Sequence, residues 1–375
     1  NGTLTLENVV IKSIGKSSTG KNQKFLIFAE SGDAGNFIIR NSKILAKSDE
    51  FNNKIALVYL KDYINCIIEN SYFENQSKNT EVGGCIWLSA TTNQRNQVII
   101  RNNTCINNSK DEVIGIYDNK NSEITVIENN YIESKYDSDF TVTLYRMGSK
   151  NIYLKNNTIK SHAIELSIDL SNECDVEICN NIIIHDCTLQ SANNRSGIRT
   201  TNTNVHIYNN SFYMKNTEDD VFTSIPFNVG ENIVKGCNIL WDVYNSHNAC
   251  GNALNRIDCY YQNLYSIYGK YYNSTIRTEA LKLVGNIEAC NCNFNIEQAV
   301  SAGYADKYVI FKNCKGGIFI NDAKKEKCII ENSSITYCYG NINNPVNSQI
   351  RLNACCDDGY IHYSSINNVC VNLDH

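Results

Sequence analysis

Short segments in which apolar and polar residues alternate recur along the chain, and several of them end in paired asparagines. Ile152–Ile159 reads IYLKNNTI, and Val176–Ile183, which begins 24 residues later, reads VEICNNII. Alternation over four to eight residues is typical of a β-strand with one buried face. No long stretch shows the 3.6-residue periodicity of an amphipathic helix. The pattern therefore predicts an all-β chain built from short strands.

The phrase apolar–x–Asn–x–x–apolar repeats along nearly the whole chain, with glycine in place of asparagine in one degenerate copy. Up to Gly236 the copies are 24 to 33 residues apart, and from Asn273 onward they are 18 to 22 residues apart. Repeats of this length indicate a solenoid or an array. The aligned positions are Asn8, Asn41, Asn70, Asn102, Asn129, Asn156, Asn180, Asn209, Gly236, Asn273, Asn291, Asn313, Asn332 and Asn353.

Each repeat contains two clear strands and usually a third, such as Ile164–Ile168, Val176–Ile178 and Ile182–Ile184. We expect each repeat to form one coil, or rung, that pairs in parallel with the next rung at about 4.8 Å. Inward Ile, Leu and Val side chains then stack into columns and bury a continuous core. An inward asparagine at the bend after the second strand can join a ladder of side-chain hydrogen bonds.

This arrangement resembles the right-handed parallel β-helix of the pectate-lyase-like superfamily, and the resemblance covers nearly the whole chain. It implies one continuous, single-stranded β-helix over residues 1–375 with about 14–15 rungs. Residues 1–236 hold the long rungs and residues 237–375 the short ones. The fold does not define an activity, because it hosts pectate lyases, polygalacturonases, epimerases, phage tailspikes and adhesins.

The long rungs carry their extra residues at one corner, after the third strand and before the first. Loops collected on one side of a solenoid usually border its binding face. The first strand of each rung lies beside this corner, so its outward residues are the candidates for a site. These excursions are Glu74–Gly84, Asn107–Glu112, Glu133–Asp139, His185–Gly197 and Lys215–Val221.

Alternation places Ile86, Leu88 and their counterparts inward, and so fixes the outward residues of the same strands. The outward positions predict an exposed aromatic column that runs into a charged group. Asp118 and Arg146 follow at strand ends, where alternation no longer fixes their direction. The aromatic members are Trp87, Tyr117 and Tyr145, and the charged members are Glu165, Asp169 and Arg199.

Aromatic faces beside carboxylates and arginine suit a sugar chain, because rings stack on the apolar faces of pyranoses while polar groups fix orientation. The predicted substrate-binding residues are Trp87, Tyr117, Tyr145 and Arg146. Three exposed rings also need a cover, and a loop or a neighbouring subunit is an alternative to a ligand.

The same surface offers candidate catalytic groups, namely Asp169, Glu165, Asp118 and Arg199. Asp118 and Asp169 are two rungs, or about 9.6 Å, apart. This separation is close to that of inverting glycosidases, whose two carboxyl groups lie roughly 6.5–9.5 Å apart. Glu165 and Asp169 lie on the same rung and offer a closer pair. An enzyme of this kind is a polysaccharide lyase or a glycoside hydrolase. The alternative is a surface salt-bridge ladder, because the charges of Asp118, Arg146, Asp169 and Arg199 alternate in sign.

The enzymes of the superfamily contribute no motif that matches this chain. Pectate lyases carry a calcium-binding Asp cluster with a catalytic Arg, and polygalacturonases carry Asn-x-Asp, Asp-Asp, Gly-His-Gly and Arg-x-Lys. Here Asp219-Asp220 falls in a loop and Asp357-Asp358 in a short rung, and neither Gly-His-Gly nor Arg-x-Lys occurs. We therefore predict neither a metal site nor a cofactor.

Charge and cysteine content limit the partners and the compartment. The net charge is -5 without a basic run, which argues against nucleic acid, and no apolar run is long enough for a membrane span. The 17 scattered cysteines favour buried free thiols, and folding in a reducing cytoplasm or in an anaerobe over oxidative secretion. Asn1–Leu4 already reads as strand, so we expect the chain to be a piece of a longer protein.

The asparagine-rich, proline-poor composition is most similar to that of a bacteriophage tailspike or receptor-binding fragment. That resemblance implies recognition of a cell-surface polysaccharide, with or without cleavage, a homotrimer, and a place on the virion tail or outside the cell. Two alternatives stay open. The first is a stand-alone bacterial polysaccharide lyase or glycoside hydrolase, and the second is a non-enzymatic surface adhesin or structural solenoid.

Overall fold

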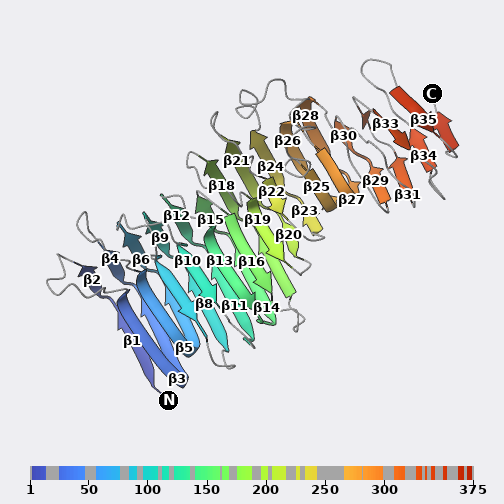
Figure 1. Ribbon diagram of the computed structural model, residues 1–375. Coiled ribbons are helices and arrows are strands. Elements are labelled where there is room, and N and C mark those ends of the chain that lie inside the picture. The colour runs from blue at the N-terminus through green and yellow to red at the C-terminus, as the bar shows by residue number, and fades with distance from the viewer. Residues whose placement is uncertain are drawn as a thin grey trace. The chain divides into compact units, whose positions relative to one another are not determined.

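The computed structural model consists of β-strands and connections, and its described part contains no helix (Figure 1). None of the described elements is therefore a helix long and apolar enough to cross a membrane. The described residues are 2–13, 25–46, 56–76, 84–90, 96–108, 112–117, 122–135, 140–160, 163–168, 175–187, 196–201, 205–216, 225–228, 233–242, 266–280, 282–298, 308–316, 327–331, 334–335, 339–342, 349–352, 362–366 and 370–373.

The chain divides into two compact units, Asn1–Val205 and His206–His375. The prediction of one continuous helix over residues 1–375 stays a prediction. The strands of the first unit are β1 (Thr3–Glu7), β2 (Val10–Ser13), β3 (Phe25–Arg40), β4 (Lys43–Ala46), β5 (Ala56–Glu69), β6 (Tyr72–Asn75), β7 (Ile86–Ser89), β8 (Gln97–Arg101), β9 (Thr104–Asn107), β10 (Ile114–Tyr117), β11 (Ile124–Glu128), β12 (Tyr131–Ser134), β13 (Phe140–Met147), β14 (Asn151–Lys155), β15 (Thr158–Lys160), β16 (Ala163–Ile168), β17 (Asp175–Cys179), β18 (Ile182–Cys187) and β19 (Ser196–Thr201).

The second unit has the same kind of strands, and its described ladders are also parallel, as in β25 with β27 and β26 with β28. Its strands are β20 (His206–Tyr208), β21 (Ser211–Asn216), β22 (Ile225–Asn228), β23 (Ile233–Lys235), β24 (Asn238–Asp242), β25 (Ser266–Tyr272), β26 (Thr275–Ala280), β27 (Lys282–Cys290), β28 (Asn293–Gln298), β29 (Tyr308–Lys312), β30 (Lys315–Gly316), β31 (Lys327–Glu331), β32 (Ser334–Ile335), β33 (Tyr339–Ile342), β34 (Gln349–Leu352), β35 (His362–Ile366) and β36 (Cys370–Leu373).

A rung of the first unit consists of three strands, and each strand pairs in parallel with its counterpart one rung later. β10, β11 and β12 form one rung and pair with β13, β14 and β15 of the next. The long strands β3 and β5 each combine the first and second strands of a rung, so β5 pairs with both β7 and β8. Figure 1 shows these strands side by side with their arrows in the same direction. The predicted parallel β-solenoid is confirmed.

The core is formed by the inward residues of successive strands. Every inward position predicted on β7, β10 and β13 is buried, with at most 1% of its surface exposed. These positions are Ile86, Leu88, Ile114, Ile116, Val142 and Leu144. The excursions predicted at one corner fall between third and first strands, as between β6 and β7, although their predicted bounds include the last residues of the third strands and, at Gly197, part of β19. Alternation therefore located both the core and the corner that carries the loops.

The aligned position of the repeat is the bend between the second and third strands. All twelve of its described members have left-handed backbone, with φ between 49° and 63°. Asparagine and glycine adopt this conformation at lower cost than other residues, which explains why the position is asparagine in nearly every copy. Asn332 and Asn353 lie outside the described residues.

The predicted inward asparagine ladder exists, but the asparagine after the bend forms it. The bend asparagines form exposed side-chain hydrogen bonds of their own, such as that from Asn291 Nδ2 to Asn273 Oδ1 at 3.2 Å. The residue after the bend points inward, and Asn103, Asn130, Asn157 and Asn181 are at most 3% exposed. Each of the first three donates from Nδ2 to Oδ1 of the next at 3.0–3.1 Å. Their Nδ2 atoms also donate to main-chain carbonyls at 2.8–2.9 Å. We call these four residues the amide ladder.

Serine or cysteine takes the ladder position in several other rungs. Ser71 donates through Oγ to the Glu69 carbonyl at 2.8 Å. In the second unit, the thiols of Cys292 and Cys314 donate to main-chain carbonyls at 3.4 Å. The eight cysteines whose side chains the structure describes are free, and all of them but Cys290 are buried, which agrees with the prediction of buried free thiols. These short side chains keep the inward position hydrogen-bonded without an amide.

A ladder of alternating charge runs along the outward residues that precede the bend. Arg40 Nη2 lies 2.9 Å from Glu7 Oε2, and Arg101 Nη2 lies 2.7 Å from Glu69 Oε2. Each pair joins two rungs, and both arginine side chains are more than 40% exposed. Exposed pairs of this kind contribute about 0.2–1 kcal/mol each, so they favour the register of the rungs more than they hold the fold together.

Candidate functional site

Five outward aromatic rings form a continuous column on the first unit. They come from β3, β5, β7, β10 and β13, and neighbouring ring centroids are 5.6, 5.8, 5.5 and 6.1 Å apart. We call this column the aromatic stripe, and its members are Phe28, Tyr59, Trp87, Tyr117 and Tyr145. The sequence predicted the last three, and the structure adds Phe28 and Tyr59.

The stripe depends on one glycine. Phe28, Tyr59 and Trp87 are directly opposite one another in the strand register, and the next position in that column is Gly115. Tyr117 lies two residues further along β10, and its ring covers Gly115. A Cβ atom at Gly115 would lie only 2.7 Å from Tyr117 Cε2. The missing side chain therefore lets Tyr117 occupy the place that continues the stripe beside Trp87.

Glu112 fixes the Tyr117 ring from the adjoining corner. Tyr117 Oη donates to Glu112 Oε1 at 2.7 Å, and Thr143 Oγ1 donates to the same oxygen at 3.3 Å. Thr143, which shares Glu112 with Tyr117, is only 2% exposed. Glu112 was not predicted as a site residue, because it lies where an excursion ends and alternation gives no direction there. These contacts restrict the motion of the ring before any ligand is present.

The stripe remains accessible along its length. Phe28 is 54% exposed, and the other four rings are half-buried. Neighbouring rings are tilted by 43–58°, so each presents part of a face or an edge to solvent. Five adjacent strands at about 4.8 Å give a stripe about 19 Å long. This length suits an extended ligand better than a single small molecule.

Cationic groups lie at both ends of the stripe. The guanidinium of exposed Arg146 lies 5.1 Å from the Tyr145 ring centroid, and this arginine has left-handed backbone with φ of 53°. Near the other end, Lys61 is hydrogen-bonded to Glu30, and this bond raises the pKa of Lys61. Arg146 can therefore orient a polar or acidic group of a ligand. Lys61, in contrast, is already paired with Glu30, and its Nζ lies 3.9 Å from Asp62 Oδ2, so it offers a polar group of mixed charge.

The structure places two of the four predicted catalytic residues in one column with the stripe. In the strand register Thr143 is opposite Glu165, and Glu165 is opposite Arg199. Only the backbone positions of Glu165 and Arg199 are described, while Asp118 and Asp169 lie outside the described residues. Their catalytic roles stay predictions. In the described part of the chain, no three His, Cys, Asp or Glu side chains gather closely enough to hold a metal ion.

Comparisons with known proteins found no relative of this chain. No protein-family model matches the chain, and neither does a curated protein or a solved structure.

Proposed function

We propose that the aromatic stripe binds a polysaccharide that lies along the solenoid. The observation that supports this proposal is the row of five contiguous, partly exposed rings. Pyranose rings have apolar faces that stack on aromatic side chains, and flanking polar groups fix their orientation. Arg146, Glu112 and Lys61 are the described groups beside the stripe that are suited to the second task.

Packing between rungs is a second role of the same rings. An aromatic pair contributes about 0.5–1.5 kcal/mol beyond the area it buries, so the stripe also stabilises the stack. Packing alone does not require a tyrosine placed over a glycine and held by a carboxylate. Those details orient the Tyr117 ring within an exposed surface, as a binding platform requires.

The finer proposal is a host cell-surface polysaccharide, recognised by a trimeric receptor-binding protein of the tailspike type. Its support is the solenoid together with the asparagine-rich, proline-poor sequence with many free thiols. Light scattering tests the assembly, for which we expect a stable trimer. A monomer would favour a stand-alone enzyme or an adhesin.

Cleavage of the bound chain is a separate step, and we assign it to Asp169, Glu165, Asp118 and Arg199. Incubation of the protein with a panel of bacterial surface polysaccharides tests this assignment, with products measured by size-exclusion chromatography. The expected result is shortening of one polymer by the wild type and none by Asp169→Asn. Polymers that all stay intact with the wild type would leave a binding function without catalysis.

Removal of single rings tests binding directly. We expect Tyr117→Ala and Tyr59→Ala each to weaken polysaccharide affinity about tenfold, which is the loss of about 1.4 kcal/mol of stacking energy. Tyr153→Ala is the matched control, because Tyr153 is a half-buried tyrosine on β14, outside the stripe, with Lys155 Nζ 3.9 Å from its ring centroid. Affinity electrophoresis measures all three, and equal affinities would contradict the proposal.

A further inference from the structure

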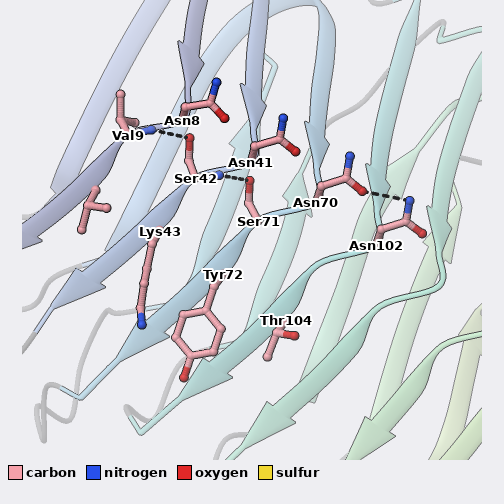
Figure 2. A pocket seen from close by; sticks show the side chains of 11 residues that line it. Asn8, Val9, Asn41, Ser42, Lys43, Asn70, Ser71, Tyr72, Asn102 and Thr104 are labelled. Carbon is pink, nitrogen blue, oxygen red and sulfur yellow. Dashed lines mark hydrogen bonds between the residues drawn. The ribbon is translucent and has the colours of Figure 1, made fainter.

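A surface hollow of about 590 Å³ lies along the bend between the second and third strands of the first rungs. Its most regular feature is a row of four outward carboxamides at the left-handed positions, shown in Figure 2. They belong to Asn8, Asn41, Asn70 and Asn102. We call this hollow the amide groove. The stripe, in contrast, lies on the first strands of its rungs, so the two surfaces are distinct.

The carboxamides of the groove retain free hydrogen-bonding capacity. Asn102 Nδ2 donates to Asn70 Oδ1 at 3.2 Å, whereas the side chains of Asn8 and Asn41 have no hydrogen-bond partner among the described residues. Each amide has two N–H donors and a carbonyl acceptor. The row therefore presents donors and acceptors at a repeat of about 4.8 Å along the solenoid.

The wall of the groove contains further polar groups and one charge. Lys43, Tyr72 and Thr104 project from the third strands, and Lys43 Nζ lies 4.8 Å from the Tyr72 ring centroid. No carboxylate is among the described residues that line the groove, and Lys43 is the only charged residue in that set. A ligand that is neutral or negatively charged and rich in hydroxyl groups suits this lining.

We propose that the amide groove binds an extended neutral or acidic glycan along the solenoid, independently of the aromatic stripe. Sugar hydroxyls both donate and accept hydrogen bonds, as the exposed carboxamides do. A peptide strand finds no open backbone here, because Lys43, Tyr72 and Thr104 donate their N–H groups to the preceding rung. A nucleic acid needs several cations to neutralise its phosphates, and the lining supplies one.

The double variant Asn41→Gly/Asn70→Gly tests the groove. Glycine removes two amides while it tolerates the left-handed backbone, as Gly236 does with a φ of 63° at the equivalent position of the second unit. Asn129→Gly/Asn156→Gly is the matched control, because it makes the same change at two bends outside the groove. Both double variants are made in a Trp87→Ala background, so that binding at the stripe does not mask the result.

Binding is measured on an array of neutral and uronate-containing hexasaccharides, with polyadenylate as a further probe. We expect at least one hexasaccharide to bind the Trp87→Ala protein and to lose affinity about tenfold or more in the groove variant alone. Lys43→Gln should weaken uronate binding more than neutral binding. Three results would overturn the proposal. The first is that no hexasaccharide on the array binds, the second is that the groove and control variants lose affinity equally, and the third is that polyadenylate alone binds. If the groove variant loses affinity for a hexasaccharide and Tyr117→Ala does not, that hexasaccharide binds at the groove and not at the stripe.

Discussion

Replacement of Asn157 with alanine is expected to lower the free energy of unfolding by about 3 kcal/mol or more. Asn157 Oδ1 accepts hydrogen bonds from N and Nδ2 of Asn130, both at 3.0 Å, and its Nδ2 donates to the Ile127 carbonyl and to Asn181 Oδ1. Without the amide, several buried groups lose their partners, at about 1–3 kcal/mol for each unsatisfied group. Asn157 is 1% exposed, so water cannot readily replace these bonds.

Asn156→Gly is the control for that variant, because Asn156 is the adjacent, exposed residue at the left-handed bend. Glycine accepts this backbone, so we expect a change below about 1 kcal/mol. Urea unfolding followed by circular dichroism measures both variants. If both variants lowered the urea midpoint of unfolding equally, the hydrogen bonds of the amide ladder would not be a main source of the stability of the solenoid.

Gly84→Ala is expected to be the second strongly destabilising change, by about 2–3 kcal/mol. A Cβ atom there would lie 2.1 Å from the main-chain carbonyl oxygen of Glu112. Because backbone atoms are involved, no rotation of a side chain relieves the overlap. Gly84 also accepts the N–H of Leu57 at 3.0 Å, so a shift of its chain weakens the pairing with the preceding rung. Movement of Glu112 should in addition release Tyr117 and weaken glycan binding.

Gly115→Ala separates the two effects of Gly84→Ala. The three atoms nearest to the added methyl group all belong to the Tyr117 ring, with a nearest distance of 2.7 Å to Cε2, and this ring can rotate away. We expect a stability change below about 1 kcal/mol together with weaker glycan binding. Thermal unfolding and affinity electrophoresis of the two variants give the comparison. A large loss of stability in Gly115→Ala would show that Tyr117 is a structural residue first.

The fold was predictable because two independent sequence patterns mark each repeat, namely the alternation in the strands and the asparagine at the bend. The position of the amide ladder was harder to predict. A left-handed residue interrupts the period of two, and alternation then cannot say which of two adjacent asparagines points inward. Asn156 takes the bend and Asn157 the ladder, a division that becomes clear only when the backbone angles are known.

Regular alternation also decided which residues of the candidate site could be predicted. Trp87, Tyr117 and Tyr145 lie on strands whose inward residues are regular, so their direction followed. Phe28 and Tyr59 were missed because β3 and β5 merge two strands of a rung, and in β5 the left-handed Asp62 interrupts the alternation. Asp118 and Glu112 lie at or beyond strand ends, where sequence periodicity carries no information on direction.

The fluorescence of Trp87 tests the central claim most directly. The chain has two tryptophans, and Trp241→Phe leaves Trp87 as the only one, at the middle of the aromatic stripe. Titration of that variant with the polysaccharide that it binds should change the emission of Trp87 with the same dissociation constant that calorimetry gives. Tight binding that leaves the emission of Trp87 unchanged would contradict the assignment of the stripe as the binding surface.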